Sequence, residues 1–141
     1  MGTSANNLRK LQVVQNSLAR VVTGLKRREH IQPALKRLHW LPINERIQYK
    51  VALITHKVVS TQQPSYLSDI VSIYRPTRPL RSASQQRLSG QVTKTKGAEN
   101  SFSCASTTIW NKLPLDLRME GNIKTFKSKL KTFLFQSAYR M

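Results

Sequence analysis

Acidic side chains are scarce in this sequence of 141 residues. Asp and Glu number 6 together, against 24 Lys and Arg, so the formal net charge is +18. A compact body with so much charge of one sign repels itself unless a polyanion neutralises it. The imbalance predicts a polyanionic partner, with RNA or DNA as the first choice and an anionic membrane surface as the second.

Cysteine and long apolar runs are also scarce. Cys104 is the only cysteine, so no disulfide can form within the chain. His30, His39 and His56 do not follow a zinc-ligand spacing, and we expect neither a metal nor another cofactor. No apolar run reaches the length of about 18 residues that a membrane span needs, and the first residues lack the apolar core of a signal peptide. We expect an intracellular protein without stable membrane association, for which the nucleus is one suitable compartment.

The sequence lacks the motifs that usually carry catalysis. Its few acids are spread out without an Asp-Asp or Asp-x-Asp pair, and no glycine-rich phosphate loop occurs. Cys104 falls on a predicted helix and is interpreted as a small buried apolar side chain. We predict no catalytic residue, and we do not expect the chain alone to be an enzyme.

Apolar residues recur at steps of three and four in several segments, which is the period of one helical face. The pattern predicts helices over about 7–23, 32–38, 43–60, 100–112 and 122–137, and one or two helical turns in "PSYLSDI". Asn6 or Asn7 is the expected cap of the first helix, and Gly24 its stop. The stripe of that helix comprises Leu8, Leu11, Val14, Leu18, Val21 and Leu25.

Between the helical segments lies a stretch rich in Pro, Gly, Ser and Thr, with weak periodicity and short strand-like pieces near Leu88 and Val92. We predict a mostly α fold, a small multi-helix domain with a long irregular basic arm. The expected parts are an N-terminal helical part (1–71), the arm (72–99) and a C-terminal helical pair (100–141).

Three basic clusters are the candidate phosphate contacts. The first lies between the first two predicted helices and on the second, although a solvated connector would have the same composition. Its members are Lys26, Arg27, Arg28, Lys36 and Arg37.

The second cluster is in "YRPTRPLRS", where Arg75, Arg78 and Arg81 share a period of three with Pro76 and Pro79. Polyproline II has three residues per turn and rises about 3.1 Å per residue, which would place the three arginines on one ridge. Each guanidinium on such a ridge can bind a phosphate in bidentate fashion. A basic proline-rich linker, or docking into an aromatic groove of a partner, are the alternatives.

The third cluster is Lys124, Lys127 and Lys131, on one flank of the last predicted helix. A basic amphipathic helix can contact nucleic acid or a membrane interface. It can also be a surface helix whose apolar face packs within its own domain.

One Trp-Leu-Pro and one Trp-x-x-x-Pro sequence are each predicted to form a corner between helices, with a structural rather than a binding role. In "LKRLHWLPINERIQYK", Pro42 breaks the chain and starts the next helix, and Trp40 falls between two apolar stripes. Burial of Trp40 at this joint is favoured over an exposed stacking platform. Trp110 and Pro114 form a similar corner, with Trp110 inward and Pro114 ending its helix.

Long phrases of the chain resemble the region downstream of the polymerase in LINE-type (non-LTR, jockey-like) retrotransposon endonuclease–reverse transcriptases. The first phrase is "LQVVQNSLARVVTGLKRREHIQPALKRLHWLPINERIQYKVALITHKVV". The later phrases "PSYLSDIVSIYRPTRPLRSA", "SFSCASTTIWNKLPLDLR" and "FKSKLKTFLF" are similar to family phrases in the same order. The resemblance runs from about Leu11 to Phe135. The family usually has Pro at Thr107 or Thr108 and an acid near Asn100.

The resemblance implies a nucleic-acid-binding accessory region of an RNA-directed DNA polymerase. It would follow the polymerase thumb, a further expected partner, and help to hold template RNA or target DNA. The catalytic acids of the family's polymerase and endonuclease have no counterpart in this chain, and the zinc knuckle of some relatives is missing. The alternative is a structural or protein-interaction remnant with no independent activity.

Overall fold

The computed structural model describes residues 3–76, 78, 85–90 and 101–139. Within these residues the chain is mostly helical, which confirms the predicted fold class, and its extended pairing is one isolated bridge between Ile73 and Leu88. The helices are α1 (Ala5–Thr23), α2 (Gln32–Arg37), α3 (Ile43–Thr61), α4 (Ser65–Ser68), α6 (Phe102–Lys112), α7 (Leu115–Arg118) and α8 (Ile123–Tyr139).

Local capping explains where the longer helices begin and end. Ser4, rather than the expected Asn6 or Asn7, caps α1, and its Oγ accepts a hydrogen bond from the backbone N–H of Asn7 at 3.3 Å. Gly24 ends α1 in the left-handed conformation, with φ of 70°, as expected of a glycine stop. Asn122 caps α8, and its Oδ1 accepts from the N–H of Lys124 at 2.8 Å.

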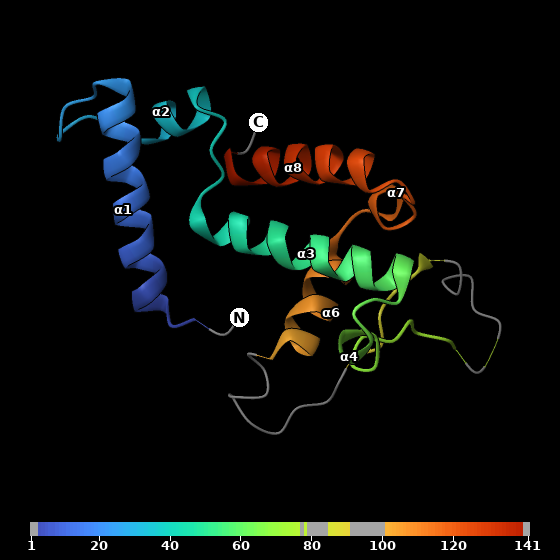
Figure 1. The fold of residues 1–141 in the computed structure, drawn as a ribbon. Coiled ribbons are helices and arrows are strands. Elements are labelled where there is room, and N and C mark those ends of the chain that lie inside the picture. Colours follow the sequence, from blue (N-terminus) through green and yellow to red (C-terminus); the bar gives the residue numbers. More distant parts are fainter. Residues whose placement is uncertain (1–2, 77, 79–84, 91–100, 140–141) are drawn as a thin grey trace.

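The central element is α3, and the other long helices pack on it. Figure 1 shows α8 lying beside α3 and running in the opposite direction, with α6 against the other side of α3. Helices α1 and α2 stand at the N-terminal end of α3, and α1 crosses it steeply. The N-terminal helical part and the C-terminal helical pair therefore form a single packed unit.

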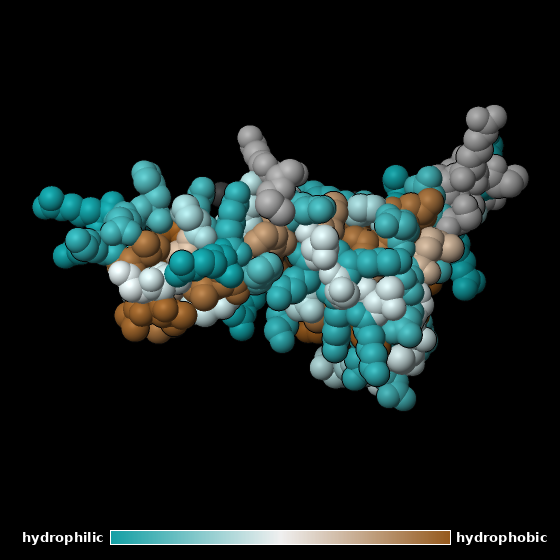
Figure 2. Space-filling model, turned by 90° about the horizontal axis from the view of Figure 1, so that it is seen from above, coloured by the Kyte–Doolittle hydropathy of each residue, from teal (hydrophilic) through white to brown (hydrophobic). Residues whose placement is uncertain are grey.

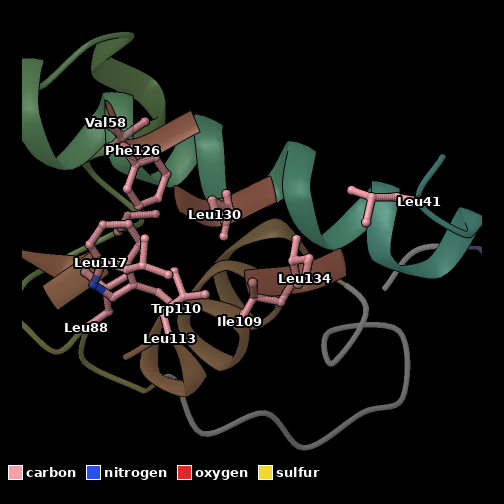
Figure 3. Close-up of a cluster of buried hydrophobic side chains, with 12 residues drawn as sticks. Leu41, Val58, Leu88, Ile109, Trp110, Leu113, Leu117, Phe126, Leu130 and Leu134 are labelled. Carbon is pink, nitrogen blue, oxygen red and sulfur yellow. The ribbon is translucent and has the colours of Figure 1, made fainter. Parts of the chain in front are cut away.

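The main core lies where α3, α6 and α8 meet. Trp110, Phe126 and Leu130 are almost completely buried and point toward one another, with Val58 and Leu117 beside them (Figure 3). A second, smaller cluster joins α1, α2 and the end of α8; its buried members are Ala19, Leu35 and Tyr139. Phe135 borders both clusters and connects them.

Part of the predicted arm is packed on the helices. Leu88 is buried in the main core, and the bridge from Ile73 confirms extended structure near it, whereas Val92 lies outside the described residues. Side chains of α6 and α7 hold the backbone of this piece: Trp110 Nε1 donates to the carbonyl of Gln86 at 2.8 Å. The Asn111 amide accepts from the N–H of Leu88 at 2.9 Å and donates to its carbonyl at 3.0 Å. The piece over 85–90 is thus part of the fold.

The apolar stripe predicted for the first helix faces largely away from the protein. Of its members in α1, Leu11, Val14, Leu18 and Val21 are exposed, whereas Gln15 and Ala19 are buried. Two hydrogen bonds turn the glutamine side of α1 toward the protein. Gln15 Nε2 donates to the carbonyl of Leu41 at 2.8 Å, and the N–H of Ile43 donates to Gln12 Oε1 at 2.9 Å. The backbone at the Pro42 break has no helical partners for these groups, so the two glutamines supply them.

Helix α7 has no counterpart in the predicted elements. Pro114 does follow the end of α6, but it also stands at the N-terminal cap of α7. The short helix buries Arg118, whose guanidinium donates to the carbonyls of Leu113 and Gln85. Burial first, and nearby Arg87 second, lower the pKa of Arg118 from its ordinary value.

Candidate nucleic-acid interface

A row of cations lies along α3 on the side next to α8. Arg46, Lys50 and Lys57 are separated by four and seven residues, which places them on one face of the helix, and all three are exposed. On α8, Lys124, Lys127 and Lys131 are exposed as well, at steps of three and four. Helices α3 and α8 lie side by side (Figure 1). Lys127 and Lys131 line hollows that the α3 row also lines, whereas Lys124 is exposed but lines neither of them.

The wider hollow between these helices has a volume of about 600 Å³. Lys50, Lys57 and Lys127 line it from the two helices, and Ile54 and Ile123 give it an apolar floor. His56 lies beneath it, almost completely buried, with its ring stacked on Phe126 at 4.2 Å between centroids. Its Nε2 is 2.7 Å from the carbonyl oxygen of Glu120, which fixes the turn before α8 against α3.

A narrower hollow of about 320 Å³ continues toward the start of α3. Trp40 and Tyr49 line it together with Arg46, Lys50 and Lys131. Lys50 borders both hollows, so they are neighbours along one surface, which we call the α3–α8 groove. This groove combines five cations with two aromatic side chains, and it takes them from segments about 90 residues apart in the chain.

Trp40 is half-buried rather than fully buried as expected. It packs against the cluster of Leu35 and Tyr139, and its carbonyl accepts a 2.7 Å hydrogen bond from Tyr139 Oη. Its remaining surface lines the groove. Trp40 is therefore both part of the joint and a possible stacking surface, whereas Trp110 is buried as predicted.

The cations of the groove are not neutralised by the protein itself. Within the described part of the chain, one ion pair occurs, between Lys129 Nζ and Glu120 Oε2 at 2.7 Å. This contact lowers the pKa of Glu120 and raises that of Lys129, chiefly through the hydrogen bond between them. Lys129 points away from the row of groove lysines, as its spacing on α8 requires. The five groove cations are thus available to an external anion.

The first predicted cluster lies apart from the groove. Lys26, Arg27 and Arg28 are exposed in the connector between α1 and α2, at the end of the molecule away from α3 (Figure 1). Arg37 is exposed on α2 and lines a separate hollow of about 350 Å³. Lys36 is half-buried, with its Nζ 5.5 Å from the centroid of the Tyr139 ring, so part of its charge is engaged by a cation–π contact.

Of the second predicted cluster, Arg75 and Arg78 are exposed, and Arg81 lies outside the described residues. The chain next to Arg75 is held in place, because the N–H of Tyr74 donates to the carbonyl of Arg87 at 2.8 Å. The polyproline ridge of three arginines stays a prediction.

Arg46, Lys50 and Lys57 were missed from the sequence. A signal was present: on the predicted helix over 43–60, steps of four and seven already place them on one face. They are separated by apolar and polar residues, so they form no basic run. Only the packing of α8 against α3 turns two sparse rows into one surface.

Other classes of site are not formed by the described residues. Among 3–76, 78, 85–90 and 101–139, no three His, Cys, Asp or Glu side chains come together in a group that could hold a metal ion. Cys104 is half-buried on α6. None of the helices in this part of the chain combines the length and apolar character that crossing a membrane requires.

Comparisons with protein-family models, with curated proteins and with solved structures found no match for this chain.

Proposed function

We propose that this chain is a nucleic-acid-binding accessory region of a retrotransposon reverse transcriptase, without catalytic residues of its own. The observation that carries the proposal is the α3–α8 groove, which is lined by five unpaired cations and has a half-buried tryptophan and a tyrosine at one end, beside three of them. The resemblance of the ordered phrases to the region downstream of LINE-type polymerases supports the same function. The total charge of +18 is in keeping with a polyanionic partner.

The groove favours a single strand over a duplex. Ammonium groups on both helices can follow a phosphate backbone, and every phosphate that they neutralise releases counterions. The aromatic rings at one end can stack an unpaired base, whereas the bases of a duplex are already stacked on each other. We therefore place template RNA, or an exposed DNA strand, along the groove.

Fluorescence anisotropy with a labelled single-stranded RNA and a labelled duplex DNA, at several salt concentrations, tests the proposal. The affinity should fall with salt, and on single strands each phosphate contact contributes about −0.7 to the slope of log K against log salt. The triple variant Lys50→Ala, Lys127→Ala and Lys131→Ala should bind less tightly and reduce the slope by up to about 2.

The matched control removes the same charge elsewhere, with Arg9→Ala, Lys10→Ala and Lys112→Ala at exposed positions outside the groove. This variant should keep most of the affinity. An affinity that does not depend on salt would overturn the proposal, and equal losses in the two triple variants would overturn the assignment of the groove. The structural module without independent activity would then be the better interpretation.

A further inference from the structure

The most hydrophobic face of α1 has no partner within the described protein. Leu11, Val14, Leu18, Val21 and Val22 are each about half exposed or more. With 100° per residue in a helix, these five positions fall within one arc of about 100°, roughly a quarter turn from the buried Gln15 and Ala19. Figure 2 shows apolar side chains gathered at the α1 end of the molecule, beside hydrophilic ones. Contiguous apolar surface of this kind usually marks a contact site.

The stripe also forms one wall of a groove. Leu11, Val14 and Leu18 face Trp40 and Ile43 across a hollow of about 240 Å³, between α1 and the start of α3. Gln15 also lines this hollow, and its Nε2 already donates a hydrogen bond to the carbonyl of Leu41. The surface is therefore concave, mostly apolar and held in shape by hydrogen bonds that do not depend on a partner.

The charge around this groove is positive. Arg46 lines it from α3, and Lys10 stands one turn before Val14 on the other side of the stripe. No acid occurs between Met1 and Arg28, so α1 carries no compensating carboxylate. The complementary ligand is apolar in the middle and acidic at its flanks.

We propose that the α1 groove binds a helix of another protein whose apolar stripe is flanked by acidic side chains. Side chains at i, i+3/i+4 and i+7 of such a helix match a groove of this form. A second copy of this chain is disfavoured, because it would place equal positive charges against each other. A bilayer is disfavoured because its flat surface cannot fill the hollow between α1 and α3.

The probe for the test is a fluorescein-labelled helical peptide of about 20 residues, with leucines at the i, i+3, i+4 and i+7 spacing and glutamates between them. It should bind the full chain, and the same peptide with lysines in place of the glutamates should bind at least about tenfold more weakly.

Two neighbouring valines give a matched pair of variants. Val14 in the stripe and Val13 outside it are 57% and 58% exposed, so either can be replaced by Glu without opening the core. Val14→Glu should reduce peptide binding roughly tenfold or more, because it places a carboxylate inside the apolar contact. Val13→Glu adds the same charge to the same helix and should leave the affinity within about twofold. Leu18→Gln, with far-UV circular dichroism on all variants, is a second and uncharged test of the stripe.

The outcomes separate this proposal from the others. Peptide binding that Val14→Glu abolishes and Val13→Glu preserves would support it. No binding of the acidic peptide, or equal losses in both valine variants, would overturn it. The chain is also tested for binding to anionic lipid vesicles and for dimer formation by sedimentation. If the acidic peptide does not bind and Val14→Glu abolishes vesicle binding or the dimer, the occupant of the groove is a bilayer or a second copy, and the proposal is overturned. Arg46 borders both grooves, so the uncharged Leu18→Gln is the variant to compare: it should weaken peptide binding and keep the RNA affinity, and failure of the α1 groove and failure of the α3–α8 groove are then distinguishable.

Discussion

The two tryptophans show how much the surroundings of one residue type decide its role. Trp110 is almost completely buried among Phe126 and the helices of the main core, and its indole N–H is used by the Gln86 carbonyl. Trp40 packs one side in the smaller cluster, and its remaining surface lines both the α3–α8 groove and the α1 groove. Both are followed by a proline in the sequence, at Pro42 and Pro114, so the sequence pattern alone does not distinguish them.

Replacement of each tryptophan by alanine should therefore have different effects. Trp110→Ala should lower the free energy of unfolding by about 3–5 kcal/mol, because it leaves a large cavity and an unpaired carbonyl. Trp40→Ala should cost less, about 1–3 kcal/mol, because part of the ring is already in solvent. Only Trp40→Ala should weaken RNA binding in a folded protein, by about 1–3 kcal/mol if a base stacks on it. Urea denaturation and anisotropy measure the two effects, and a full RNA affinity in Trp40→Ala would exclude stacking there.

Tyr139 gives a prediction about alkaline pH. Its hydroxyl donates to the Trp40 carbonyl, and burial raises its pKa above the ordinary value, with Glu45 contributing in the same direction. The folded state thus holds the phenolic proton more tightly than the unfolded state. The corresponding stability is fully present below the unfolded pKa of about 10 and is lost as the pH rises through the higher folded value.

Tyr139→Phe removes the hydrogen bond and the ionisation together. At neutral pH the variant should be about 1 kcal/mol less stable than the wild type. The difference should shrink between about pH 8 and about pH 11, since only the wild type loses this contribution there. Urea denaturation at both pH values checks this, and a difference that grows with pH would contradict the assigned direction.

At the scale of the elements, local signals in the sequence were sufficient to locate the helices but not to predict which face of each helix is buried. The three-and-four period located α1, α2, α3, α6 and α8 to within about two residues of each end. The period in α1 also suggested a buried stripe, yet the buried residues are Gln15 and Ala19. That choice depends on the Leu41 carbonyl and the Ile43 N–H, which reach α1 only in the folded chain.

The same limit applies to the site. Lys127 and Lys131 were predicted from their own helix, and the structure places both in the groove. Their partners Arg46, Lys50 and Lys57 are on α3, and no local pattern links the two helices. Helix α7 was not predicted, and the extended piece predicted near Leu88 was not expected to pack on the helices, because both features depend on long-range contacts of Arg118 and Leu88.

The end of α1 offers a test of local backbone geometry. Gly24 has φ of 70°, and an added Cβ there would meet no other atom within 4 Å. Gly24→Ala should therefore cost only the left-handed backbone energy, about 1 kcal/mol of unfolding free energy. Gly121 has equal space but no positive φ, so Gly121→Ala should be neutral or stabilise by up to about 1 kcal/mol. Equal effects in urea denaturation would show that backbone strain is not the cause.

At the scale of the whole molecule, the two apolar clusters should unfold together. Phe135 contacts both, and α3 connects the corner at Trp40 to the core at Trp110. In the variants Trp40→Phe and Trp110→Phe, the remaining tryptophan reports on one cluster at a time. In each variant, the urea midpoint measured by tryptophan fluorescence should equal the midpoint measured by circular dichroism on the same variant. Separate midpoints would mean that α1 and α2 form a second folding unit.

The packed piece over 85–90 is attached almost entirely through its backbone. The carbonyls of Gln85, Gln86, Leu88 and Ser89 accept from Arg118, Trp110, Asn111 and Thr107. Side chains of α6 and α7 and the backbone of residues 72–74 therefore hold this piece, and within the piece itself only Leu88 contributes a buried side chain. Gln86 has φ of 45°, a left-handed conformation that few residue types adopt, whereas the exposed Arg87 can change its side chain while the path of the chain stays the same. The piece is a position where new surface properties can arise without any change in the core.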